Sequence, residues 1–153
     1  MFLPTLCGAD PASVLSWRMT FDGRPDQARA VRRLVAALLH GCAFLDDVLL
    51  AVDEMVVNAL RHTRSGEPGG SFTVEIRRWS DAKEPDLVAV AVLDQGGPGE
   101  PAATDADELA ESGRGLRTVS LTAASWGWFG NPSGRTVTAV FTAPDQAICC
   151  EAA

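Results

Sequence analysis

The chain has 153 residues, 46% of them hydrophobic and 22% charged, so it is long enough for one domain with a core and too short for two. Its 13 basic and 20 acidic side chains give a net charge of −7. Because a nucleic acid is bound by a positively charged surface, this balance argues against a nucleic-acid partner.

The first segment, residues 1–13, is predicted to be an N-terminal extension. It is mildly apolar, but it has no basic flank and is interrupted by Pro4, so it does not read as a signal peptide. No apolar run is long enough to span a bilayer. The four cysteines form no CxxC pair, which favours reduced thiols. These features predict a cytoplasmic protein without membrane contact.

The first half of the chain predicts one strand and two helices. Residues 14–21 alternate and are rich in strand-forming side chains, which indicates a first strand. Apolar residues then recur with helical spacing in residues 25–41, and a second helix is predicted over residues 45–62. The segment RSGEPGG, residues 64–70, ends the helical pattern.

The second half predicts four strands, a lid and one helix. Residues 71–79 and 86–94 form an antiparallel hairpin, whose second strand is apolar almost throughout and is therefore expected to be central and buried on both faces. Residues 95–112 are rich in glycine, proline and acidic side chains, which is typical of a functional lid. A helix over residues 113–124 precedes two strands, within residues 125–142.

The order of these elements predicts an α+β fold. We expect a two-layer α/β sandwich, with helices covering one face of a mixed, mostly antiparallel sheet. The domain extends over residues 14–142, and residues 143–153 form a flexible C-terminal tail.

On the second helix, Glu54, Asn58 and His62 recur every four residues and therefore share one side. The opposite side is apolar and must pack on the sheet. Such a polar stripe is often only the solvated side of an amphipathic helix. Asn58, however, is a poor helix-interior residue, which indicates that its amide has another partner.

Asp94 follows an apolar strand and precedes a glycine cluster. An ionised carboxylate only accepts hydrogen bonds, so it can bind the exocyclic amino group of adenine. Gly96 and Gly99 would allow the chain to approach a flat base closely, although an ordinary turn after a strand is the simpler interpretation. Thr136 enters the last strand and offers a hydroxyl to the base or to its bound water, or merely favours β structure.

The segment Ser-Gly-Arg-Gly-Leu, residues 112–116, opens a helix. Backbone N–H groups at a helix N-terminus attract phosphates, and glycines let the phosphate oxygens approach. Arg114 could add a charge-assisted contact. This pattern is weak evidence when taken alone.

Taken in order, AVDEMVVNALRHT, AVLDQGGPG, ESGRGLRTV and GRTVTAVF resemble the N, G1, G2 and final Gly-Thr boxes of GHKL (Bergerat-fold) ATPases. Within this superfamily the chain is most similar to the compact anti-sigma-factor serine/threonine kinase branch. The resemblance covers residues 14–142 approximately. The four boxes are specific as a set, whereas each alone is not.

The resemblance implies a binding site for ATP and Mg²⁺. Asn58 would bind the Mg²⁺ that bridges the ATP phosphates, and Glu54 would act as general base toward a serine or threonine of a partner protein. Asp94 would recognise adenine. His62 would lie on the phosphate side, or it would be satisfied by the last helical carbonyls. The residues expected to hold the phosphates through their amides are Gly113, Arg114, Gly115 and Leu116.

Three features depart from the family pattern. Pro98 replaces the second glycine of DxGxG, and Gly99 follows one position late. Glu111 stands where sporulation-type relatives tend to carry arginine, so a γ-phosphate would be repelled there. The lid is also acidic, which disfavours an additional phosphate clamp unless Mg²⁺ compensates.

Two functions follow from the resemblance. The first is a serine/threonine kinase that binds a sigma factor or an anti-sigma-factor antagonist, with a homodimer formed through the first strand and helix. The second is a non-catalytic ATP-binding module in which nucleotide orders the lid and controls partner binding. A histidine-kinase fragment is disfavoured because His40 lies at a helix end and not in a helical pair. A different fold that imitates the boxes would bind no ATP.

Overall fold

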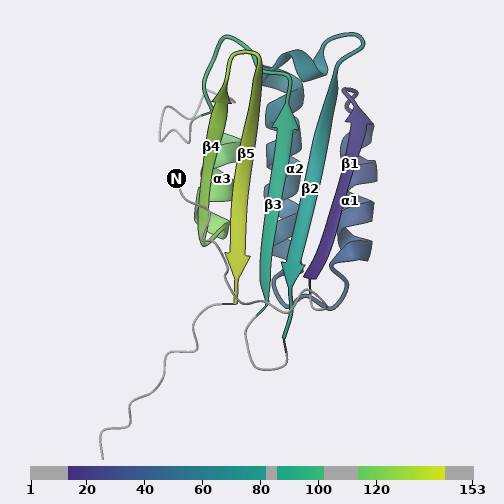
Figure 1. Ribbon diagram of the computed structural model, residues 1–153, viewed down its shortest axis with the longest axis vertical. Helices are drawn as coiled ribbons and strands as arrows, with labels where there is room; N and C mark the ends of the chain where they lie inside the picture. Colours follow the sequence, from purple (N-terminus) through teal and green to yellow (C-terminus); the bar gives the residue numbers. More distant parts are fainter. Residues whose placement is uncertain (1–13, 82–85, 102–113, 144–153) are drawn as a thin grey trace, which may run out of the picture.

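The computed structural model describes residues 14–81, 86–101 and 114–143. In these ranges one sheet forms the front layer in Figure 1, and the α-helices form a second layer behind it. The elements are β1 (Val14–Asp22), α1 (Gln27–Leu38), α2 (Leu45–His62), the 3-10 turn η2 (Arg64–Gly66), β2 (Ser71–Trp79), β3 (Leu87–Asp94), α3 (Arg114–Thr122), β4 (Ser125–Asn131) and β5 (Gly134–Thr142). The predicted two-layer α+β fold is confirmed.

The sheet has five strands in the order β1-β2-β3-β5-β4. Every pairing between these strands is antiparallel, so the expected mixed character is absent from the described residues. In Figure 1, α1 lies behind β1, α2 behind β2 and β3, and α3 behind β4 and β5. No helix among the described residues is both long and apolar enough to cross a membrane.

Three predicted segments fall partly or wholly outside the described residues. The N-terminal extension, 1–13, is one of them. Of the predicted lid only 95–101 is described, and of the C-terminal tail only residue 143.

The core lies between the helices and one face of the sheet. On β3, buried Val88, Val90 and Val92 alternate with half-buried Ala89 and Ala91. The strand is central, as predicted, but the expectation that both of its faces are buried is wrong. The helices cover one face, and the residues on the other face, Leu87, Ala89, Ala91 and Leu93, are only half-buried.

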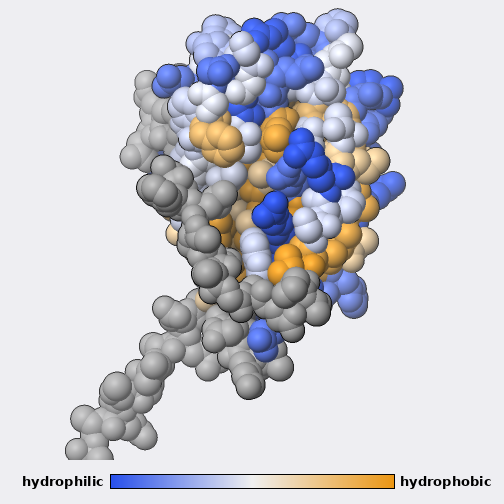
Figure 2. Space-filling model, viewed as in Figure 1, coloured by the Kyte–Doolittle hydropathy of each residue, from blue (hydrophilic) through white to orange (hydrophobic). Residues whose placement is uncertain are grey.

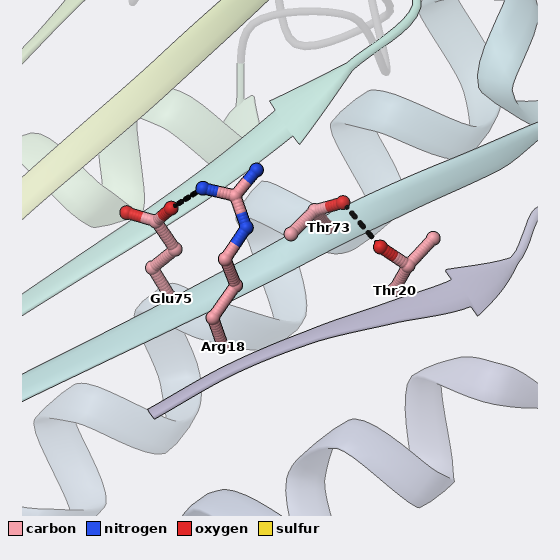
Figure 3. Close-up of polar contacts among 4 residues, drawn as sticks. All are labelled: Arg18, Thr20, Thr73 and Glu75. Atoms are coloured by element: carbon pink, nitrogen blue, oxygen red, sulfur yellow. Dashed lines mark hydrogen bonds and ion pairs between the residues drawn. The ribbon is translucent and has the colours of Figure 1, made fainter. Parts of the chain in front are cut away.

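The other face of the sheet is open, and Figure 2 shows polar and apolar side chains next to each other on it. Two cross-strand pairs from β1 and β2 contribute to its polar part (Figure 3). Arg18 forms an ion pair with Glu75, and the hydroxyl groups of Thr20 and Thr73 lie 2.8 Å apart. This face therefore has its own polar contacts, which are separated from the helices by the thickness of the sheet.

The aromatic part of the core provides a test of the fold. Phe72 is 1% exposed and stacks on Phe21 with 5.5 Å between ring centroids. We expect Phe72→Ala to lower the free energy of unfolding by about 3–5 kcal/mol, because it removes buried surface and leaves a cavity. Phe129 is 61% exposed, so Phe129→Ala should change the free energy of unfolding by less than about 0.5 kcal/mol. Urea unfolding of both variants measures the difference, and equal losses would contradict the packing.

Candidate functional site

The polar stripe predicted on α2 lies beside the buried face of that helix. Glu54 and Asn58 are half-buried, and His62 is exposed in the last turn. The side of α2 that packs into the core contains Val48, Leu49, Ala51, Val52, Met55, Val56 and Ala59. Glu54 and Asn58 thus sit at the margin of the core, where a polar side chain remains accessible to a ligand.

The first turn of α3 lies against Glu54. A Cβ atom added at Gly115 would come within 2.6 Å of Glu54 Oε2, so glycine leaves room here for the carboxylate. Leu116 is 1% exposed and fixes the start of α3 in the core. Its side chain therefore serves packing, and only its backbone remains available to a ligand. Gly113 lies outside the described residues, and Arg114 is described as the first residue of α3.

The contact between Glu54 and Gly115 predicts that Gly115→Ala separates stability from activity. Alanine favours a helix over glycine by about 0.5–1 kcal/mol, and the atom it meets is the flexible end of a side chain. We therefore expect unchanged or slightly higher thermal stability. An activity that depends on the Glu54 carboxylate should fall by about 100-fold because the carboxylate is displaced.

The matched control for this variant is Ser120→Ala, at an exposed position of α3. Thermal unfolding and the activity of the domain are measured on both variants. Loss of stability in Gly115→Ala, or activity equal to that of Ser120→Ala, would contradict the role of this contact.

Asp94 ends β3 on the side of the sheet that the helices cover. It is 7% exposed, and its Oδ1 accepts a hydrogen bond of 2.7 Å from the backbone N–H of Gly96. Burial raises the pKa of Asp94, whereas the Gly96 N–H and the guanidinium of Arg135 lower it. Gly96 has φ +75°, a left-handed conformation that favours glycine. The carboxylate thus makes the turn that the sequence suggested, and it does so at a buried position.

Residues 95–99, called here the glycine segment, are held at the end of α2. The backbone N–H of Arg64 donates to the Gly96 carbonyl at 2.8 Å. The Arg64 guanidinium donates to the carbonyls of Gln95, at 3.0 Å, and of Pro132 in the β4–β5 turn. These bonds join η2, β3 and the β4–β5 turn, which meet at the upper end of the sheet in Figure 1.

The same segment contacts α2 directly. A Cβ atom at Gly97 would lie 2.8 Å from the carbonyl oxygen of His62. Along α2, Asn58 lies one turn before His62 and one turn after Glu54, which contacts Gly115. Two of the predicted boxes therefore lie against α2, which contains a third. The start of α3 lies at Glu54, the loop after Asp94 lies at His62, and Asn58 lies between these two contacts.

Arg135 was not selected from the sequence, yet it is central to the geometry of this region. It is 5% exposed, and its guanidinium donates to the carbonyls of Gly97, at 2.8 Å, and of Gly99. The guanidinium carbon also lies 5.7 Å from the centroid of the Trp128 ring, within cation–π range. Gly99 is thus bound through its carbonyl, and the chain around Pro98 has a fixed path.

Thr136 lies on the other face of the sheet. It pairs with Leu93, whereas Arg135 pairs with Asp94, and residues opposite each other on neighbouring strands share one side. Strand alternation therefore directs Arg135 to the helix-covered side and Thr136 to the open side. The Thr136 hydroxyl and the Asp94 carboxylate thus lie on opposite faces of the sheet, and the contact of Thr136 with a base stays a prediction. The alternating apolar residues of β5 could have revealed this from the sequence.

An antiparallel sheet covered by helices on one face, a helix whose polar stripe lies beside the first turn of another helix, and a buried aspartate that ends a central strand are typical of a domain of the GHKL ATPase class. A family model described as histidine kinase-like ATPase domain matches residues 21–141. The chain therefore belongs to the histidine kinase-like ATPase domain family. No curated protein matches the chain.

Among solved structures, the chain is similar to the crystal structure of the RsbU and RsbW domains of Rv1364c from Mycobacterium tuberculosis. The two share 20% sequence identity with a TM-score of 0.63. The match covers 85% of this chain and 33% of that one, so this chain spans about a third of its length. At this identity the likeness concerns the fold.

Proposed function

We propose that this chain is an ATP-binding regulatory domain that transfers the γ-phosphate of ATP to a serine or threonine of a partner protein. The contact of Glu54 with the start of α3 carries the proposal, because it places an acidic side chain where a helix N-terminus attracts phosphate. Asp94 lies near the other end of the same stripe of α2. The resemblance to anti-sigma-factor kinases indicates a sigma factor or its antagonist as partner.

The described residues offer hydrogen-bonding groups of the kinds that ATP and Mg²⁺ require. Asp94 is an acceptor for the adenine amino group, and the N–H groups of the first turn of α3 are donors for phosphate oxygens. Asn58 would hold Mg²⁺ through its amide oxygen, and the ion would neutralise phosphate charge. Among residues 14–81, 86–101 and 114–143, no three His, Cys, Asp or Glu side chains form a metal site.

Glu54 is the group proposed to carry the proton. The partner hydroxyl oxygen forms a bond to the γ-phosphorus, the bond from that phosphorus to the bridging oxygen breaks, and ADP leaves. Glu54 accepts the hydroxyl proton. Its half-buried carboxylate lies next to the first turn of α3, which supports its assignment as the proton acceptor.

A second function is favoured by the same contact. The Glu54 carboxylate itself lies at the first turn of α3, where its charge opposes that of a phosphate. A domain with this arrangement can use ATP as a ligand that controls partner binding, without phosphoryl transfer.

Two measurements test these functions. Calorimetric titration with ATP, ADP and GTP, with and without Mg²⁺, should show adenine-selective binding that Mg²⁺ strengthens. Incubation with γ-labelled ATP and purified candidate antagonist proteins should then place label in the partner. Binding without label supports the second function, and equal affinity for ATP and GTP would count against both.

A further inference from the structure

Arg135 and Asp94 are two buried side chains of opposite charge type on the helix-covered side of the sheet. They lie opposite each other on β5 and β3 and are 5% and 7% exposed. A buried charge is costly unless it has close polar partners. For Arg135 these partners are the carbonyls of Gly97 and Gly99, together with the ring of Trp128. The side chain is therefore fixed by the segment that follows Asp94.

The hydrogen bonds of the guanidinium go to the backbone of the glycine segment. Both of its terminal nitrogens donate to the glycine segment, and its Nε is buried without a partner among the described residues. We therefore expect Arg135 to act on a ligand at Asp94 through the backbone of Gly97 and Gly99.

We propose that Arg135 is a positioning residue for nucleotide recognition, which holds the glycine segment against the end of α2 and so fixes the place of the Asp94 carboxylate. This inference rests on the proposed function. The planar guanidinium spans two carbonyls on either side of Pro98, which a lysine with a single ammonium group cannot reproduce. Without it, the two glycines regain conformational freedom, and ordering them on binding costs affinity.

The test compares Arg135→Lys and Arg135→Gln with Arg18→Gln, a matched control on the open face of the same sheet (Figure 3). Hydrogen exchange of the peptide covering residues 94–101 is measured without nucleotide, and ATP affinity is measured by calorimetry. We expect faster exchange and ATP binding weakened about tenfold in both Arg135 variants. In Arg18→Gln both quantities should stay within about twofold of wild type.

Each result supports or overturns the inference. Wild-type ATP affinity in Arg135→Lys would show that positive charge suffices, and unchanged exchange in the folded variants would show that the glycine segment is held by other contacts. Either outcome overturns the proposal. Thermal unfolding shows whether each variant is folded. If Arg135→Gln does not fold, the exchange rate and ATP affinity of Arg135→Lys decide between these outcomes. Absence of ATP binding by the wild type would refute the proposed function and the nucleotide role of Arg135, whereas the exchange data would still report on the segment.

Discussion

Asp94→Asn is expected to weaken ATP binding by about 100-fold, because a hydrogen bond to a charged group is lost and a donor is placed opposite the adenine amino group. Asparagine keeps an oxygen that can accept from the Gly96 N–H, so the turn should persist. Burial raises the pKa of Asp94, which means that the folded chain disfavours its charge. Removing that charge is therefore compatible with a stable fold, and the loss should appear in binding.

The control for this variant is Asp86→Asn. Asp86 precedes β3 and pairs with Arg78 at 2.7 Å, and β3 separates it from Asp94. Calorimetric titration of both variants with ATP should show near wild-type affinity for Asp86→Asn. An unchanged affinity in Asp94→Asn, or equal losses in the two variants, would remove Asp94 from adenine recognition.

Periodicity predicted the elements well, because each had a clear pattern of its own. The alternation over residues 71–79 and the helical spacing over residues 45–62 coincide with β2 and α2. The double burial of β3 was predicted from apolarity alone, which does not show whether a second layer covers the strand. On the open face Leu87 and Leu93 lie beside the small Ala89 and Ala91, and all four are only half-buried.

The site was predictable where it depends on order along the chain, and less so where it depends on packing. The sequence placed Glu54 and Asn58 on one side of a helix, but the contact of Glu54 with Gly115 depends on how Leu116 anchors α3 in the core. The position of Arg135 was available from strand alternation, because it shares the helix-covered side of β5 with Val137 and Ala139. The Gly-x-Thr pattern instead selects the next residue, Thr136, and leaves the position of Arg135 unspecified.

Glu54→Gln is expected to reduce label transfer to a partner protein by about 10²–10⁴-fold, since glutamine cannot accept the hydroxyl proton. ATP binding should be retained or strengthened, because a negative charge is removed beside the first turn of α3. This combination separates a general base from a residue that only binds nucleotide. Single-turnover transfer from labelled ATP, measured together with calorimetry, determines both quantities.

The adjacent residue provides the matched control for Glu54→Gln. Asp53 also lies on α2, but its carboxylate is ion-paired with Arg32 of α1 and so is directed away from α3. Asp53→Asn should therefore transfer label at close to the wild-type rate. Transfer that survives in Glu54→Gln would assign the proton to another acceptor. A different result would support the binding-module function: neither the wild type nor the two variants transfer label, and Glu54→Gln binds ATP more tightly than the wild type. The Glu54 carboxylate would then only repel the phosphates of bound ATP.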